Sequence, residues 1–178
     1  EVKLIDFGSS CFLDDRLLSY VQSRSYRAPE VILGLPYSQQ IDIWSLGCVI
    51  AEIWTGYVLF QNDSVQSLLA RVVGIIGPFP REMMMCGRFV PQYFTQDGRL
   101  YRELDMPPPP QGVQPELHRR IQLLLPKHSS LRQRMRTDDE QFLDFLSSLL
   151  RHDPAQRPLA ADALEHPWLA PGRYPDGL

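Results

Sequence analysis

Apolar side chains gather at helical spacing in four stretches of the chain. Residues 41–55 are apolar on most sides, which is typical of a helix in the middle of a domain. Residues 65–76 and 139–150 each place apolar side chains on one face, at positions three and four apart. A shorter helix is expected over residues 160–165. The pattern predicts a mainly helical fold.

Polar residues and glycines mark where these helices begin and end. Asp63-Ser64 and the run 137–139 precede the second and third helices, as residues that accept hydrogen bonds from free amides do. Asp42 lies at the start of the first helix, where its carboxylate can cap the helix or act on a neighbouring loop. Gly56 and Gly77 follow the first two helices and predict their C-terminal ends.

Two parts of the chain, residues 2–30 and residues 77–136, lack helical periodicity. Residues 2–5 predict a short strand that ends at Asp6, and residues 7–30 predict a long ordered loop, which is acceptable in a compact domain when the loop is functional. Residues 77–136 are irregular. Within them Asp97-Gly98 predicts the turn of a small hairpin that joins residues 93–94 to 100–101.

Two further features of residues 77–136 stand out. Pro107 to Pro110 predict a stiff polyproline II spacer, with an SH3-type ligand as the alternative. A basic stretch follows and predicts a solvated face, or else a docking patch; it consists of Arg119, Arg120, Lys127, Arg132, Arg134 and Arg136.

The composition bounds the class of protein. The 178 residues suit one domain, and 44% hydrophobic with 22% charged residues is ordinary for a globular chain. A net charge of −3 gives no indication of a nucleic-acid partner, and no apolar run reaches the roughly 20 residues of a membrane span. We therefore expect neither a nucleic-acid nor a membrane partner. The sequence does not indicate an oligomeric state.

The three cysteines, Cys11, Cys48 and Cys86, are scattered and show no zinc-ligand spacing. We expect free thiols in a reducing compartment, and therefore an intracellular protein of the cytoplasm, the nucleus or both. Cys11 lies within the loop of residues 7–30, where a redox-sensitive thiol is the alternative.

Two tripeptides bracket this loop. Asp6-Phe7-Gly8 and Ala28-Pro29-Glu30 stand in this order with 19 residues between them. The order and spacing are those of a protein kinase activation segment, in which the aspartate holds magnesium and the segment docks the peptide substrate. Asp-Phe-Gly alone is a weak match, whereas the pair is specific. Asp6 is therefore the candidate catalytic, cofactor-binding and metal-binding residue, with ATP and Mg²⁺ as cofactors.

From residue 1 to about 169 the chain resembles the C-terminal lobe of eukaryotic protein kinases. Residues 42–47, Asp-Ile-Trp-Ser-Leu-Gly, resemble the start of the family's central helix, whose aspartate braces the catalytic loop; the resemblance assigns this role to Asp42. Residues 152–158, His-Asp-Pro-Ala-Gln-Arg-Pro, resemble a late motif whose arginine pairs with the glutamate of Ala-Pro-Glu. This implies a structural pair between Glu30 and Arg157.

The activation segment narrows the resemblance. Residues 20–34 resemble the CMGC group, and residues 6–12 with Gln22-Ser23-Arg24 resemble its dual-specificity tyrosine-regulated kinases (DYRK). Residues 93–95, 100–101, 125–127 and 130–132 resemble plant- and protist-type members. In these enzymes a tyrosine of a Tyr-X-Tyr motif autophosphorylates. The second tyrosine of that motif corresponds to Tyr20, whereas Leu18 replaces the first.

A phosphate on Tyr20 would add about −1.5 to −2 charge, and Arg24 and Arg27 are spaced to bind it through charge-assisted hydrogen bonds. The phosphate should order the segment and hold Arg24 beneath the substrate residue that follows the phosphoacceptor. The resemblance implies protein substrates with Ser or Thr, proline-directed. It also implies a mainly α fold, that of a kinase C-lobe without its N-lobe. The partial kinase domain would span residues 1–169, with a CMGC-type insert at about 77–136, and residues 170–178 would form a tail.

The Gly-rich loop, strand lysine, helix glutamate and His-Arg-Asp catalytic loop of kinases are not in this sequence. We therefore expect a fragment that is inactive alone. Two alternatives stay open: a pseudokinase or scaffold that keeps the fold for binding, and a homeodomain-interacting-type CMGC kinase. Sequence upstream of Glu1 distinguishes the first, because a catalytic-loop aspartate and a strand lysine indicate an enzyme.

Overall fold

The computed structural model describes residues 3–12, 21–104 and 120–170. Its helices are α1 (Pro29–Leu33), α2 (Gln40–Thr55), α3 (Val65–Ile76), α4 (Arg81–Cys86), α5 (Leu131–Met135), α6 (Glu140–Leu149) and α7 (Ala160–Leu164). Its strands are β1 (Tyr101–Glu103) and β2 (Ile121–Leu123). Short 3-10 turns occur at η1 (Phe7–Ser9), η2 (Arg24–Tyr26), η3 (Val90–Gln92), η5 (Pro154–Gln156) and η6 (Pro167–Leu169).

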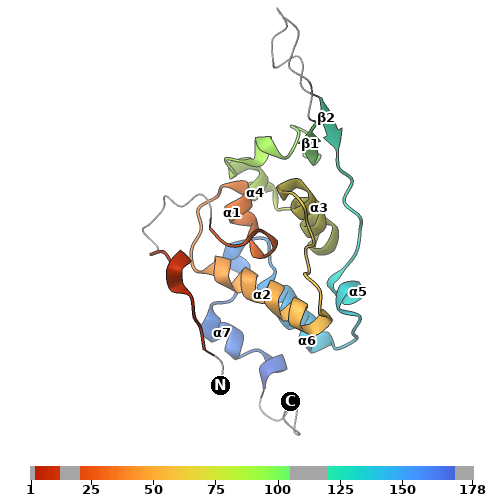
Figure 1. Cartoon of the computed structure of the whole chain (residues 1–178). Coiled ribbons are helices and arrows are strands. Elements are labelled where there is room, and N and C mark those ends of the chain that lie inside the picture. Colours follow the sequence, from red (N-terminus) through yellow and green to blue (C-terminus); the bar gives the residue numbers. More distant parts are fainter. Residues whose placement is uncertain (1–2, 13–20, 105–119, 171–178) are drawn as a thin grey trace, which may run out of the picture.

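Helix α2 lies at the centre of the helical body, with α6 alongside it and α1 and α3 above it (Figure 1). The core forms where these helices meet, because their apolar faces are turned toward one another. Trp44, Cys48 and Ala51 of α2 are buried there, together with Phe142 and Leu146 of α6. None of the helices in the described residues is long and apolar enough to cross a bilayer.

The helices predicted from apolar spacing are present. Helix α3 has the predicted bounds, and Ser64 caps it: its hydroxyl accepts from the Ser67 amide while the Ser67 hydroxyl accepts from the Ser64 amide. Asp139 caps α6 through a 3.1 Å hydrogen bond from the Phe142 amide to its carboxylate. Local chemistry therefore determines where these two helices begin.

The start and the surroundings of α2 differ from the prediction. The N-cap residue is Gln39, and Asp42 is exposed in the first turn without capping the helix. Leu46, Val49 and Ile53 are 44%, 39% and 78% exposed, so one apolar face of α2 is uncovered within the described residues. The apolar pattern correctly indicated the sides that can be buried, but a side is buried only where another segment packs on it.

The predicted strand at residues 2–5 is wrong for the part that the structure describes. Residues 3–6 form no regular element, and Leu4 and Ile5 are 85% and 81% exposed. A strand needs a partner for its amides and carbonyls, and no described segment pairs with this one. The predicted loop at 7–30 contains η1 and η2 and ends early, because Pro29 occupies the first turn of α1.

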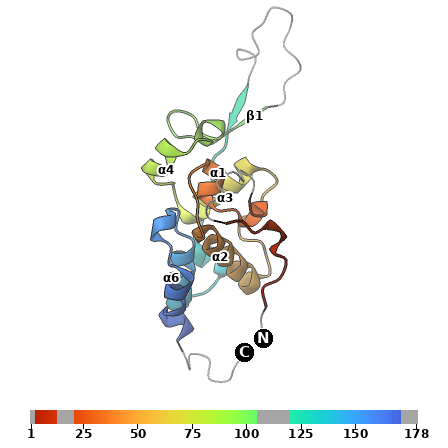
Figure 2. The same cartoon turned by 90° about the vertical axis from the view of Figure 1, so that its left-hand side faces the viewer.

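Residues 77–136 are more ordered than predicted. Strands β1 and β2 pair antiparallel, with Arg102 opposite Gln122, and they project from the helical body (Figures 1 and 2). Helices α4 and α5 were not predicted either. The small hairpin is confirmed: Phe94 and Leu100 form an antiparallel bridge around Gly98, whose φ is 78°. Pro107 to Pro110 and Arg119 lie outside the described residues.

Candidate functional site

Asp6 stands at the beginning of η1 in an unusual backbone conformation. Its φ and ψ are 62° and 67°, a left-handed geometry that few residues other than glycine adopt. Such strained positions cluster at functional sites. Its carboxylate is exposed, and no group of three metal-ligating side chains occurs among the described residues. A single carboxylate fits Mg²⁺, which takes its remaining ligands from water and substrate phosphates in phosphoryl-transfer sites.

Gln22 anchors the segment that leads to Ala28-Pro29-Glu30. Its side-chain amide donates to the Ile41 carbonyl at 2.8 Å and to the Ser45 hydroxyl at 2.7 Å. Its side-chain oxygen accepts from the Ala28 amide at 2.9 Å. Gln22 itself has a φ of 67°, so these bonds hold a left-handed residue against α2.

Tyr26 attaches the same segment to α2 farther along the helix. The Ser45 hydroxyl donates to the Tyr26 carbonyl at 2.8 Å, and the Tyr26 phenol donates to the Glu52 carboxylate at 2.6 Å. The hydrogen bond to Glu52 raises the pKa of the Tyr26 phenol above its usual value, with burial adding to the shift. Two points of α2, roughly two turns apart, thus fix the backbone of residues 22–26.

The two arginines predicted to bind a phosphate lie in different surroundings. Arg27 is 6% exposed, and it donates to the backbone carbonyls of Val21 at 3.0 Å and Gln22 at 2.9 Å. Arg24 is exposed and donates to the Asp63 carbonyl at 3.0 Å. Tyr20 and Leu18 lie outside the described residues. Arg27 therefore shapes the loop, whereas Arg24 stays at the surface.

Glu30 and Arg157 are brought together in the protein interior. The two guanidinium terminal nitrogens meet the two carboxylate oxygens at 2.6 and 2.7 Å, and both side chains are fully buried. The remaining guanidinium hydrogens reach the backbone carbonyls of Arg151, Gln40 and His152, at 2.7, 3.0 and 3.0 Å. All five donors of Arg157 are thus satisfied, which a buried cation requires.

This anchor joins three elements. Glu30 belongs to α1, Gln40 is the first residue of α2, and Arg157 directly follows η5. The Arg157 guanidinium also lies 5.2 Å from the centre of the Trp44 ring, a cation–π distance. The end of the Asp6–Glu30 segment is therefore fixed to the helical core by one buried ion pair.

His152 lies beside this anchor. Its Nε2 is 2.9 Å from the Gly77 carbonyl, and because a carbonyl only accepts, Nε2 carries the hydrogen. Nδ1 is buried without a partner among the described residues. Burial lowers the pKa of His152 to about 4, the Gly77 hydrogen bond opposes this, and the nearby Arg157 cation adds to it. The imidazole is therefore neutral at pH 7.

We expect His152 to make the protein less stable in mild acid. Its folded pKa of about 4 lies below the usual histidine pKa of 6.5, so the unfolded chain binds more protons between these values. Stability is full above pH 6.5 and falls as the pH drops toward 4. Between pH 7.5 and pH 5 the loss is about 2 kcal/mol. Urea unfolding of the protein at both pH values measures it.

The matched control is His152→Gln, which retains a donor for Gly77 but does not titrate. All other titratable groups contribute equally to both proteins. The difference between the pH dependences of the wild type and His152→Gln therefore isolates the contribution of His152. Equal pH dependence of the wild type and His152→Gln would contradict a neutral buried imidazole.

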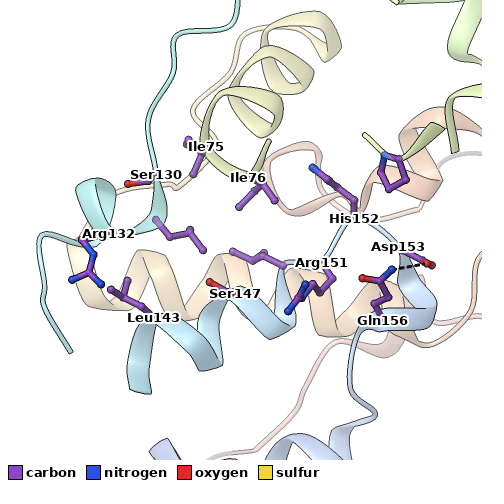
Figure 3. A pocket seen from close by; sticks show the side chains of 13 residues that line it. Ile75, Ile76, Ser130, Arg132, Leu143, Ser147, Arg151, His152, Asp153 and Gln156 are labelled. Atoms are coloured by element: carbon purple, nitrogen blue, oxygen red, sulfur yellow. Dashed lines mark hydrogen bonds between the residues drawn. The ribbon is translucent and has the colours of Figure 1, made fainter. Parts of the chain in front are cut away.

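A cavity of about 530 Å³ lies between α3, α5 and α6 (Figure 3). Its lining includes the apolar residues Ile75, Leu143 and Leu150. His152 lies toward one end of the labelled lining residues (Figure 3). Asp6 and Arg24 are not among its lining residues. The predicted site is therefore an exposed segment held on α2 rather than this cavity.

Comparison with known proteins agrees with this geometry. The model of the protein kinase domain matches residues 1–169. The serine/threonine-protein kinase ppk5 of Schizosaccharomyces pombe is 39% identical over 94% of this chain, which covers 18% of that protein. The dual specificity tyrosine-phosphorylation-regulated kinase 4 of Homo sapiens is 36% identical over 97% of this chain, which covers 31% of it.

The chain belongs to the protein kinase family. It spans about a fifth of the length of relatives such as ppk5 and the mbk-2 kinase of Caenorhabditis briggsae, of which it covers 18% and 21%. Within the family, its relatives make it a DYRK-type member of the CMGC group. The plant or protist subtype stays a prediction.

Several residues that build the site were not assigned a role from the sequence. Gln22 and Ser45 stand inside the motifs that carried the resemblance, yet their hydrogen bonds to one another follow only from the fold. The Tyr26–Glu52 bond joins residues 26 apart and has no sequence signal. Asp42, in contrast, was assigned a role from the sequence, but its exposed carboxylate forms no hydrogen bond or ion pair with a described residue.

Proposed function

We propose that this chain is the C-terminal part of an ATP-dependent Ser/Thr or dual-specificity protein kinase. The observation that carries the proposal is the segment from Asp6 to Glu30: a left-handed, exposed aspartate at one end and a buried ion pair at the other. Such an arrangement leaves the carboxylate free for Mg²⁺ while the distal end of the segment stays rigid. Family membership supports the same function.

In the proposed reaction a substrate hydroxyl oxygen bonds to the γ-phosphorus of ATP, and the bond to the bridging oxygen of ADP breaks. Mg²⁺ neutralises charge on the phosphates when it is bound. This chain would position the reactants: Asp6 would hold the metal, and the segment fixed by Gln22 and Tyr26 would hold the substrate. The resemblance assigns acceptance of the hydroxyl proton to an aspartate upstream of Glu1, so the 178 residues alone should be inactive.

The uncovered face of α2 supports a larger fold. Leu46, Val49 and Ile53 lie one and two turns apart on it and are exposed. Three apolar side chains at this spacing form a stripe that another helix can cover. We assign this face to the remaining part of the kinase domain, with Asp42 at its end available to brace the catalytic loop.

Gln22 supports a preference for proline after the phosphoacceptor. The backbone carbonyl of Gln22 accepts a hydrogen bond from the buried Arg27 guanidinium at 2.9 Å. This carbonyl is therefore already engaged and does not accept from a substrate amide. An ordinary residue placed there would leave its N–H unpaired, at about 1–3 kcal/mol. Proline has no N–H and avoids this cost. Substrates should therefore favour Ser-Pro and Thr-Pro.

Autophosphorylation of Tyr20 belongs to the same proposal. Arg24 stands at the surface close to that position in sequence and could turn from the Asp63 carbonyl to a phosphate. Arg27 would act mainly by keeping the loop in shape, because it is buried. A phosphate would then order the segment through charge-assisted hydrogen bonds.

The test uses the full-length gene product, ATP and two peptides that differ only in proline or alanine after the serine. We expect transfer of phosphate to serine, with about tenfold higher kcat/KM for the proline peptide. Asp6→Asn should lower kcat about 100-fold, because it removes the charge that holds the metal.

The control is Asp63→Asn, which changes an exposed carboxylate near the segment and should leave kcat within about twofold of the wild type. Full activity of Asp6→Asn would overturn the catalytic role of that residue. A full-length protein that binds partners but never transfers phosphate would instead be a pseudokinase.

A further inference from the structure

A second cavity of about 360 Å³ lies away from the predicted active segment, between the C-terminal end of α2, the loop after it, and α5. Trp54 and Tyr57 form an aromatic wall and are 45% and 70% exposed. Arg134 and Arg136 also line the cavity, from α5 and its C-cap.

The charge of this cavity is unbalanced. None of the described residues that line it is acidic, and the side chains of Arg134 and Arg136 form no hydrogen bond or ion pair in the described part of the chain. Arg132, two residues earlier, is different: it pairs with Asp138 at 3.0 Å and with Glu140. Two free guanidinium groups at one cavity favour an anionic ligand.

The backbone at Arg136 gives independent support. Arg136 caps α5 in the left-handed conformation, with a φ of 53°. Glycine is the residue that suits this position best, since any Cβ is strained there. The backbone conformation therefore does not favour arginine over glycine, and the fold gives no reason for an arginine side chain at this position. Strained residues of this kind cluster at ligand sites.

The cavity is connected to the substrate-binding segment. The loop that forms its wall continues to Asn62 and Asp63. Asn62 donates to the Ser25 hydroxyl at 3.0 Å, and Arg24 donates to the Asp63 carbonyl at 3.0 Å. A protein substrate held at residues 22–26 can therefore extend over this loop.

We propose that the cavity binds a phosphorylated serine or threonine of the protein substrate, with Arg134 and Arg136 as its ligands. Two guanidinium forks offer more donors than one carboxylate can accept, whereas a phosphate presents three acceptor oxygens. Trp54 and Tyr57 cover the apolar neighbours of the phosphorylated residue. The kinase would thus prefer substrates that already carry one phosphate, an inference that rests on the proposed function.

Binding is tested without catalysis, on the full-length gene product. The probe is a short fluorescent peptide with one phosphoserine, compared by anisotropy with the same peptide carrying serine. We expect the phosphopeptide to bind, and the variant Arg134→Ala/Arg136→Ala to bind it about tenfold or more weakly. The serine peptide should bind at least about tenfold more weakly than the phosphopeptide.

Two further variants separate the site from general effects. Arg132→Ala removes the same charge outside this cavity and should keep affinity within about twofold. Arg136→Gly should weaken binding severalfold, yet leave Tm unchanged or raise it by up to about 3 °C, because glycine relieves the left-handed strain. Loss of binding together with an intact fold would assign the effect to the side chain.

Two results of this assay would overturn the proposal: a wild type that does not bind the phosphopeptide, or equal losses of affinity for Arg132→Ala and Arg134→Ala/Arg136→Ala. A third result would come from the same protein mixed with vesicles of phosphatidylserine. Binding to these vesicles but not to the phosphopeptide would also overturn the proposal. Because the assay needs no ATP turnover, a protein that binds the phosphopeptide but transfers no phosphate refutes the proposed kinase activity and leaves the binding site standing.

Discussion

Replacing Arg157 by alanine is expected to lower the free energy of unfolding by about 3–5 kcal/mol. The variant leaves the Glu30 carboxylate fully buried without its partner, since both side chains are inaccessible and 2.6–2.7 Å apart. It also removes the donors of three backbone carbonyls, those of Arg151, Gln40 and His152. Chemical denaturation of the purified protein at pH 7.5 measures the loss.

One control removes an exposed arginine, and two further variants test the buried ion pair itself. Arg132→Ala breaks exposed ion pairs and should cost less than about 1 kcal/mol. Glu30→Ala should cost about as much as Arg157→Ala, and the double variant less than the sum of the two, because it strands no charge. Strictly additive losses would show that the two side chains do not stabilise one another.

Replacing Trp44 by alanine is expected to cost about 3–5 kcal/mol, because it empties the space between α2 and its neighbours. The indole is fully buried and stacks on Phe60 at 5.6 Å and on His152 at 6.3 Å between ring centres. It also lies beneath the Arg157 guanidinium. Thermal or urea unfolding, followed by circular dichroism, measures the loss.

Two tryptophan variants make this expectation specific. Trp44→Phe should cost much less than Trp44→Ala, since it keeps a stacked ring and removes an Nε1–H that has no partner among the described residues. Trp54→Ala should also cost less, because Trp54 is 45% exposed. If Trp54→Ala proved as damaging as Trp44→Ala, the core would not be centred where the structure puts it.

Helix prediction succeeded where local rules are sufficient. The apolar faces of α3 and α6 and their caps, Ser64 and Asp139, are encoded within a few residues of each other. The sequence pattern did not predict strands β1 and β2, each of which is three residues long and largely exposed. Their pairing is a contact between distant segments of the chain. Gly74 illustrates the same limit: a Cβ there would lie 2.4 Å from the Lys127 carbonyl oxygen, a closeness no local pattern reveals.

The sequence by itself determined the class of protein, the order of its main helices and the two ends of the active segment, because these depend on short motifs and on periodicity. Only the tertiary structure decided how that segment is held. Gln22, Ser45, Glu52 and Arg157 act through hydrogen bonds to residues far away in the chain. Such bonds exist only after the helices have packed, since packing alone brings their donors and acceptors within reach of one another.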